Sequence, residues 1–403
     1  MRYMENKPLP SLCDNKNCTG CCACVNACNV GALSITKDEE GFYRPQLDVD
    51  KCVRCGLCES SCPVVSSFQR YEENNAKVYA AWHRNSEIRS KSTSGGAFTA
   101  LAQVVLSKGG VVYGAAYNAE MHIQHIEVSE EADLGKLRLS KYAQSFIGDI
   151  LKLVRKRLND GRMVMFVGTP CQIAGLKNFL KKDYENLVLV DFICHGVPSI
   201  DLFISYINWL EERLGKVNHI NFRDKRKGWY DSLRVVTVDG GKEKVMRGFN
   251  DNYWVGFNDN TTLQESCYNC VVQGFPRCSD ITIADFWGIG KTVPFAYKNE
   301  IEKGVSMIVI NNNRVMSLLE DASADLHIVE RTLSEAIDKN KAAIQSSLRP
   351  QSRDTIYKDM ITFDYEFLYK KYMIPSMKQK AVKIFREFLP FPIIKFIRLL
   401  NQK

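Results

Sequence analysis

The cysteines of this chain, by their number and spacing, are the first indication of its chemistry. Ten of the fifteen cysteines lie between Cys13 and Cys62. Eight of these ten form two copies of the pattern C-x2-C-x2-C-x3-C, at residues 18–28 and again at residues 52–62. Three closely spaced thiols followed by a fourth form the ligand pattern of a cubane 4Fe-4S cluster. The segment therefore predicts two such clusters.

In proteins that hold two cubanes in this way, the fourth cysteine of each run ligates the other cluster. The expected ligand sets are Cys18, Cys21, Cys24 and Cys62 for one cluster, and Cys52, Cys55, Cys58 and Cys28 for the other. Cys13 and Cys22 lie outside the pattern and are expected not to be ligands. Structural zinc is the alternative, but zinc sites typically use two separated C-x2-C pairs.

Five further cysteines lie downstream and suggest another metal centre. Cys267, Cys270 and Cys278 are close together in sequence, whereas Cys171 and Cys194 each follow a predicted buried strand. Turns that follow the strands of an open α/β sheet line its carboxyl edge, where ligands bind. The three neighbouring cysteines and one strand-end cysteine predict a third 4Fe-4S cluster. The alternative is that these cysteines serve as small buried hydrophobic residues.

Length and composition indicate a folded protein that depends on reduced thiols. The chain has 403 residues, of which 45% are hydrophobic and 25% charged, as in soluble globular proteins of two or three domains. No apolar run reaches the roughly 18–20 residues of a membrane-spanning helix. The first residues lack the apolar core of a secretory signal. We therefore expect a cytoplasmic protein, where cysteines hold metal more often than they form disulfides.

The net charge of +8 is concentrated at one end of the chain. Residues 376–403 hold seven lysines and arginines against one glutamate, so the rest is nearly neutral. This distribution argues against nucleic acid as a partner. The same tail is rich in apolar residues, which suits peripheral contact with a membrane. Packing against the protein itself or against a partner subunit explains it equally well.

Hydrophobic patterns divide the chain into three parts. Residues 32–36 and 42–47 predict a hairpin within the cysteine-rich segment, and polar residues 69–77 predict a linker. Strand patterns at 111–117, 163–167 and 187–193 then alternate with helical patterns, including one from Ser199 to Gly215 and one after Gly96. Residues 234–246 predict a second hairpin. We expect an α+β ferredoxin-like dicluster domain at 1–70, a larger α/β domain with a mixed sheet at 76–345, and a helical tail at 346–403.

A cluster of small residues at 92–96 precedes a predicted helix and is a candidate phosphate site. Glycine allows close approach of the backbone, and a helix N-terminus presents free N–H groups to an anion. Lys141, Tyr142, Gln144 and Ser145 are candidates for further polar contacts. The chain contains no G-x-G-x-x-G between a strand and a helix and no complete P-loop. A nucleophilic pair of Cys194 and His195 is disfavoured, because adjacent residues of an extended segment point to opposite faces.

Taken together, several motifs resemble the coenzyme F420 hydrogenase/dehydrogenase beta-subunit family over roughly residues 76–345. The matching segments are 94–98, 140–142, 168–176, 194–199, 223–225, 228–229, 267–270, 280–281 and 285–288. The resemblance implies that the large domain holds FAD and a 4Fe-4S cluster. A two-cluster ferredoxin module is a common N-terminal attachment in members of this family.

The resemblance also implies roles for individual residues. The residues expected to contact FAD are Ser94, Gly95, Gly96, Lys141, Tyr142, Thr169, Pro170, Cys171 and Gln172. Cys267, Cys270 and Cys278 are expected to ligate the inner cluster, with either Cys194 or Cys171 as the fourth ligand.

The implied activity is that of an iron–sulfur flavoprotein oxidoreductase. Electrons would pass in either direction between the ferredoxin-type clusters, the inner cluster, FAD and a two-electron acceptor, either the deazaflavin coenzyme F420 or another small molecule. A protein that donates or accepts electrons is the expected partner. The alternatives are an electron-transfer adaptor without substrate chemistry of its own and a zinc-stabilised binding module.

Overall fold

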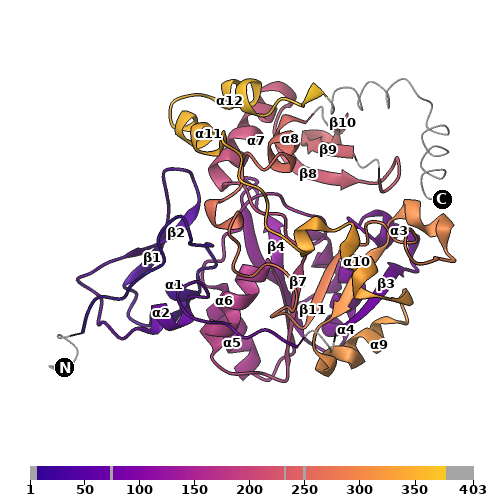
Figure 1. Cartoon of the computed structure of the whole chain (residues 1–403), viewed down its shortest axis with the longest axis horizontal. Helices are drawn as coiled ribbons and strands as arrows, with labels where there is room; N and C mark the ends of the chain where they lie inside the picture. Colours follow the sequence, from indigo (N-terminus) through magenta and orange to yellow (C-terminus); the bar gives the residue numbers. More distant parts are fainter. Residues whose placement is uncertain (1–6, 73–75, 231–232, 248–250, 378–403) are drawn as a thin grey trace.

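The N-terminal domain is a small lobe with an internal repeat. The structure, a computed structural model, describes residues 7–72, 76–230, 233–247 and 251–377. The lobe contains α1 (Ala23–Ala27), β1 (Leu33–Lys37), β2 (Tyr43–Leu47) and α2 (Leu57–Ser61), shown in indigo at the left of Figure 1. β1 pairs with β2 in antiparallel fashion, which confirms the predicted hairpin. The two short helices, one from each cysteine run, lie against each other.

The large domain is built on an eight-stranded mixed sheet. Its strands are β3 (Lys77–His83), β4 (Val111–Tyr117), β5 (Ile123–Val128), β6 (Val164–Val167), β7 (Leu187–Phe192), β11 (Ile281–Asp285), β12 (Ser306–Ile310) and β13 (Leu326–Arg331). The strand order is β13-β3-β12-β11-β7-β6-β4-β5. Strands β4, β6, β7 and β11 are parallel, and the pairs toward both edges are antiparallel. The predicted order of a dicluster domain and a larger α/β domain with a mixed sheet is confirmed.

Helices cover both faces of this sheet, which explains why its central strands are apolar throughout. On one face α4 (Ala97–Ser107) and α9 (Met316–Ala322) pack on side chains such as Met165 and Val188. On the other face α5 (Ile150–Asn159) and α6 (Pro170–Leu180) pack on Phe166 and Leu189. Two shorter helices, α3 (Ser86–Ser90) and α10 (Leu333–Asp338), complete the sheet domain. The predicted helix after Gly96 is confirmed as α4.

A second, three-stranded sheet lies above the carboxyl edge of the first (Figure 1). It has the order β10-β9-β8, from β8 (Val217–Asp224), β9 (Leu233–Val238) and β10 (Glu243–Arg247), and it confirms the predicted hairpin at 234–246. α7 (Ile200–Leu214), α8 (Asn252–Asn258), α11 (Arg353–Met360) and α12 (Tyr365–Tyr372) pack with it in one aromatic-rich core. The Ser199 hydroxyl accepts the Leu202 N–H at 3.1 Å, so α7 begins where the sequence predicts.

The segment expected as a tail from residue 346 contributes to this core before the described residues end. Ile356, Tyr357, Tyr365 and Leu368 are almost fully buried against α7 and α8. The basic and apolar stretch at 378–403, for which membrane contact and packing against protein were both left open, lies outside the described residues. Within the described ranges, no helix is both long enough and apolar enough to cross a bilayer.

The segment predicted as a linker is tied to the large domain where it is described. The Arg70 guanidinium donates to the carbonyl oxygens of Val271, Gln273 and Pro276. The Tyr71 hydroxyl donates to Asp280 at 2.9 Å. Residues 70 and 71 therefore hold the exit of the N-terminal domain against the large domain.

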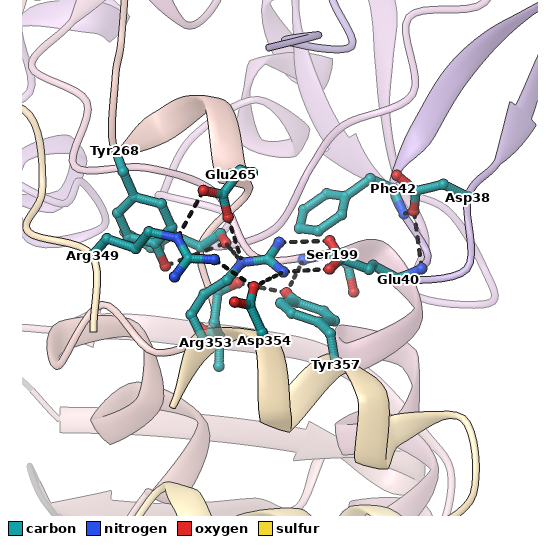
Figure 2. A network of polar contacts seen from close by, with 12 residues as sticks. Asp38, Glu40, Phe42, Ser199, Glu265, Tyr268, Arg349, Arg353, Asp354 and Tyr357 are labelled. Atoms are coloured by element: carbon teal, nitrogen blue, oxygen red, sulfur yellow. Dashed lines mark hydrogen bonds and ion pairs between the residues drawn. The ribbon is translucent and has the colours of Figure 1, made fainter. Parts of the chain in front are cut away.

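A buried ion pair joins the N-terminal hairpin to α11 (Figure 2). Arg353 is 1% exposed, and its guanidinium contacts both carboxylate oxygens of Glu40, with Nη2 to Oε2 at 2.6 Å. Its Nε donates to the Leu263 carbonyl at 3.2 Å. On the same helix the Tyr357 hydroxyl donates to Thr262 O at 2.6 Å. One network thus fixes the turn of the N-terminal hairpin, the loop before residue 265 and α11.

We predict that Glu40→Gln destabilises the protein. The substitution leaves the Arg353 guanidinium buried, with Glu265 at 3.5 Å as its nearest remaining carboxylate. The expected loss is about 1–3 kcal/mol, the range for hydrogen bonds to charged groups. Denaturant unfolding of the anaerobically purified protein measures it.

The matched control is Glu87→Gln, which removes a carboxylate from a fully exposed pair with Lys91. Solvent screens exposed pairs and they contribute little to stability, so this variant is expected to unfold close to the parent protein. Equal unfolding midpoints for the two variants would contradict a structural role for the Glu40–Arg353 pair.

Candidate functional site

A large cavity lies at the carboxyl edge of the eight-stranded sheet. Its volume is about 870 Å³. The segments 168–172 and 193–197, which follow β6 and β7, form part of its wall, as the parallel strands predict. Arg223 and Arg234, from β8 and β9 of the small sheet, lie on the wall as well. The volume lies within the range of about 300–1,000 Å³ that is common for ligand and cofactor sites.

Eight of the nine residues expected to contact FAD line this cavity. They are Ser94, Gly96, Lys141, Tyr142, Thr169, Pro170, Cys171 and Gln172. The ninth, Gly95, lies behind the wall, where its N–H donates to Ser306 Oγ at 2.9 Å. A Cβ at Gly95 would lie 2.3 Å from the Ala81 carbonyl oxygen, so only glycine allows this turn to pack on β3 and β12.

The N-terminal end of α4 faces the cavity and suits an anion. Gly96, with φ of +96°, is the N-cap of α4, and it lines the wall together with Ala97 and Phe98. A helix N-terminus presents unpaired N–H groups and the positive end of the helix dipole. The Ser94 hydroxyl donates to the Val305 carbonyl at 2.8 Å, so it holds the turn in place.

Two cations stand on the wall near this helix. Lys141 Nζ donates to the carbonyl oxygens of Lys136 and Arg138, at 3.0 and 2.6 Å. Burial lowers the pKa of Lys141 to about 7. Arg138 Nε donates to Thr99 Oγ1 at 3.1 Å, and burial lowers the pKa of its guanidinium as well. A bound phosphate would favour the charged form of both groups.

His125, another residue of the wall, has one ring nitrogen without a partner. Its Nε2 lies 3.1 Å from the Val167 carbonyl oxygen, while Nδ1 is buried and has no hydrogen-bond partner among the described residues. Burial lowers the pKa of His125 to about 4, so the ring is neutral at pH 7. Buried polar atoms are normally paired, so a polar ligand in this cavity is consistent with the orphaned nitrogen.

Four cysteines from three separate segments line the same cavity. They are Cys171 at the start of α6, Cys194 after β7, and Cys267 and Cys270. Burial raises the pKa of Cys171 to about 12, and the neighbouring thiols of Cys270 and Cys194 contribute to the rise. Burial likewise raises the pKa of Cys267 to about 12, with contributions from Cys270 and Cys171. The structure thus brings both strand-end cysteines together with the 267–270 pair.

Cys278, which sequence reasoning placed with Cys267 and Cys270, does not line the cavity. Its thiol is 3% exposed, lies 3.9 Å from the Pro170 carbonyl oxygen, and packs in the core beneath α6. Closeness in sequence was therefore a poor guide to which thiols lie together in space.

The donor set at the cavity fits a 4Fe-4S cluster. Four thiols from Cys171, Cys194 and the 267–270 pair surround one space, as a cubane requires. Their raised pKa values mean that thiolates at this depth need a compensating positive charge, which iron supplies. In the described part of the chain, no three side chains of the metal-binding types are close enough to share a single ion. This wider spacing is compatible with a cubane, because a cubane spreads its ligands over four iron atoms.

In the N-terminal domain, the crossing cysteine of the second run lies beside the first run. Cys18, Cys21, Cys24 and Cys62 border one small cavity between α1 and α2, together with Cys13, Cys22 and Cys58. Burial raises the pKa of the Cys24 thiol, and the neighbouring thiols, Cys62 among them, raise it further. The four members of the first expected ligand set are therefore neighbours, and their assignment as ligands stays a prediction.

The second expected set lies nearer to the surface. Cys55 is exposed, Cys28 and Cys52 are half-buried, and Cys58 is buried. The Cys28 thiol accepts the Ala32 N–H at 3.2 Å.

The two extra cysteines of this domain have different surroundings. Cys22 is the N-cap of α1 with φ of +59°, and Gly56 holds the equivalent place before α2 with φ of +75°. The Cys22 thiol donates to the Gly20 carbonyl at 3.4 Å. Cys13 lies beside Cys62, which is a predicted ligand. A hydrogen bond between the two thiols raises the pKa of Cys13.

Sequence reasoning missed the side chains that join the N-terminal domain to the cavity. Gln264, 1% exposed, donates to the Cys18 carbonyl at 2.7 Å. Gln144, which was expected only as a polar contact, accepts the Tyr43 N–H at 2.6 Å and donates to Gln264 at 3.3 Å. No sequence pattern marks Gln264, since Cys18 and Gln144, which it contacts, lie more than a hundred residues away.

We predict that Cys22→Gly retains the full iron content. A non-glycine residue in the left-handed region costs about 1–2 kcal/mol, and relief of that strain offsets the lost burial of the small side chain. Iron analysis and thermal unfolding of the anaerobic protein measure both effects.

Cys21→Ser is the comparison variant and is expected to lose about four iron atoms per chain, those of one cubane. A similar loss from Cys22→Gly would make Cys22 a ligand.

Family models match two parts of this chain. Residues 161–336 match the family model for the C terminus of the coenzyme F420 hydrogenase/dehydrogenase beta subunit. Residues 17–65 and residues 48–107 each match a model of a 4Fe-4S dicluster domain.

Two curated relatives resemble the N-terminal part. An uncharacterised ferredoxin of Methanocaldococcus jannaschii is 37% identical over 71 residues, which cover 91% of that protein and 16% of this chain. Ferredoxin Fdx8 of Sorangium cellulosum is 29% identical over 102 residues, which cover 89% of that protein and 20% of this chain.

Among solved structures, a chain of the F420-reducing [NiFe] hydrogenase complex from Methanosarcina barkeri superimposes with a TM-score of 0.43 and 18% identity. The match covers 68% of this chain and 91% of the hydrogenase chain.

Proposed function

Since this chain belongs to the coenzyme F420 hydrogenase/dehydrogenase beta-subunit family and carries a 4Fe-4S dicluster domain, we propose that it is an iron–sulfur flavoprotein oxidoreductase. Electrons pass between the two N-terminal clusters, a third 4Fe-4S cluster, FAD and a two-electron acceptor. The acceptor is the deazaflavin coenzyme F420 or another small molecule. The redox partner that supplies or takes up single electrons is a protein.

One observation carries this proposal: a single cavity is lined by both the gathered cysteines and the residues expected to contact FAD. Cys171 belongs to both groups, because it lies in the first turn of α6, next to Thr169 and Pro170. The Thr169 hydroxyl lies 3.0 Å from the Cys171 thiol. A metal centre at these thiols would therefore adjoin whatever fills the cavity.

For the third cluster we propose Cys171, Cys194, Cys267 and Cys270 as ligands, with Cys278 as a core residue. This assignment resolves the open choice of a fourth ligand by using both strand-end cysteines. Burial raises the pKa of all four thiols, which is typical of a site that shields its cluster from bulk water.

For FAD we propose that the N-terminal end of α4 and the cations Arg138 and Lys141 bind the diphosphate. The turn at Gly95 and Gly96 allows the backbone to approach closely, and residues 169–172 form the opposite wall. A flavin accepts electrons singly and delivers them in pairs, which is the chemistry needed between iron–sulfur clusters and a two-electron acceptor.

For the acceptor we propose the part of the cavity beneath the small sheet. Arg223 pairs with Asp285 at 3.1 Å, and the Trp229 indole donates to the same carboxylate at 2.8 Å. The Arg234 guanidinium lies 3.9 Å from the centre of the Trp254 ring. These ordered polar and aromatic groups favour substrate chemistry in this chain over the role of an adaptor that only relays electrons.

We predict that the anaerobically purified protein contains about twelve iron atoms and one FAD per chain, four irons for each cluster. Cys171→Ser, Cys194→Ser, Cys267→Ser and Cys270→Ser are each expected to lose about four irons and to retain the other eight or so. Iron analysis, flavin release and EPR of the reduced protein provide the measurements.

Cys278→Ser is the matched control, since it changes a buried cysteine of the same region that lies off the cavity wall. It is expected to keep all its iron. Iron loss from Cys278→Ser but not from Cys171→Ser would overturn the ligand assignment, and protein without flavin would overturn the function. Reduced flavin that only a partner protein reoxidises would favour the adaptor.

We also predict that FAD binds more weakly as the pH rises above 7. Because burial lowers the pKa of Lys141 to about 7, its amine becomes neutral in the free protein above that pH, whereas a bound diphosphate favours the charged form. One proton is therefore taken up on binding, and the affinity falls by at most about tenfold per pH unit. Titration of deflavinated protein between pH 6 and 9 measures the slope.

Lys141→Met is expected to bind FAD more weakly at pH 6 and with a smaller dependence on pH. An unchanged slope in this variant would show that another group takes up the proton.

A further inference from the structure

Helix α6 joins the N-terminal domain to the cavity. α1 and α2 both pack against α6, as Figure 1 shows. At Gly175, an added Cβ would lie 2.8 Å from Cys21 Sγ, 3.1 Å from Cys21 Cβ and 3.3 Å from Ala23 Cβ. The backbone of α6 is therefore in direct contact with the loop that carries the first cysteine run, and this position has no room for any side chain.

The same face of α6 carries a cysteine of the cavity. Cys171 precedes Gly175 by four residues, so the two positions lie about one helical turn apart on one side of α6. The Cys21 thiol thus approaches the helix one turn away from the Cys171 thiol.

Buried amides fix the other side of this junction. Gln264 donates to the Cys18 carbonyl, and its own N–H donates to the Val197 carbonyl at 2.8 Å. Cys18 is thereby tied to the segment that follows Cys194 and to the one that precedes Cys267. The Asn26 side chain adds a bond of 2.8 Å to the Gly148 carbonyl. The loop of the first run is held from three directions.

The two N-terminal ligand sets differ in their position relative to this junction. In the first set Cys18 and Cys21 are buried and Cys24 and Cys62 are half-buried, whereas in the second set Cys58 is buried, Cys28 and Cys52 are half-buried and Cys55 is exposed. The contacts with α6 and Gln264 are made by Cys21 and Cys18 of the first set, and the most exposed thiol belongs to the second set.

We propose that Gly175 is a positioning residue that sets the distance between the cluster on Cys18, Cys21, Cys24 and Cys62 and the cluster of the large domain. It follows that the cluster on Cys28, Cys52, Cys55 and Cys58 is the outer one, at which a protein partner exchanges electrons. This inference rests on the proposed function, because it requires a metal centre at Cys171.

If Gly175 were an ordinary helix residue, its replacement by alanine would stabilise the protein, whereas a positioning role predicts that the replacement disturbs the contact with Cys21. In the interior of a helix, glycine is less stable than alanine by about 0.5–1 kcal/mol, so Gly175→Ala would stabilise α6 if the position were only helical. An alanine Cβ must instead displace Cys21 or move the two domains apart. Gly175→Leu enlarges the displacement. The matched control is Gly135→Ala, where an added Cβ meets nothing within 4 Å.

EPR of the fully reduced holoprotein measures the spacing through the magnetic interaction between neighbouring clusters. The substitutions are made in a Cys52→Ser background, which lacks the outer cluster, so that the broadening reports only the two clusters on either side of α6. Cys52→Ser, alone or with Gly135→Ala, is expected to show the broadened signals of interacting clusters. Addition of Gly175→Ala is expected to weaken this broadening and addition of Gly175→Leu to abolish it, both with the iron content of the Cys52→Ser protein. The rate of flavin reduction in stopped-flow mixing with dithionite is expected to fall in the same order.

Cys52→Ser alone, which removes the outer cluster, also tests the order. The interaction between the two remaining clusters is expected to persist, since they lie on either side of α6. Persistent broadening after Gly175→Leu is added to Cys52→Ser would overturn the role of Gly175, and loss of the broadening in Cys52→Ser alone would reverse the order. The iron content of the parent protein distinguishes these outcomes from failure of the proposed function. A parent protein with only about eight irons lacks the third cluster, which refutes both the proposed function and the role of Gly175.

Discussion

The convergence of four parallel strands on one edge of the large sheet is the constraint on which the functional site depends. β4, β6, β7 and β11 end together, so the segments after β6 and β7 must meet although they are far apart in the sequence. Cys171 and Cys194 come together for this reason alone. The small sheet then closes the space above them, which turns an open edge into a cavity with four cysteines on its wall.

Burial has opposite consequences for the thiols and for the cations of this cavity. It raises the pKa of Cys171 and Cys267 and lowers that of Lys141, because burial without an oppositely charged partner disfavours the charged form of both kinds of group. A metal cluster supplies positive charge to the first and a nucleotide supplies negative charge to the second. The site is therefore electrostatically incomplete in ways that correspond to the two proposed cofactors.

The sequence was most informative where the signal is local. The cysteine runs, the hairpin between them, the strand at 111–117 and the capped helix from Ser199 each depend on neighbouring residues, and the predicted hairpin, strand and helix are confirmed. The assignment of Cys278 relied on sequence distance, which does not determine distance in the fold. Gln264 and the Glu40–Arg353 pair could not be predicted, because their partners are brought together only by tertiary packing.

These long-range contacts decide how the two redox domains work together. A ferredoxin-like domain attached only by a flexible linker would reach its acceptor by diffusion, at an effective concentration set by the linker. In this chain, Arg70 and Tyr71 tie the linker down, Arg353 holds the hairpin, and Gln264 holds the loop of Cys18. The distance between the domains is then a property of the packing, so the proposed electron transfer between them depends on residues that are not ligands.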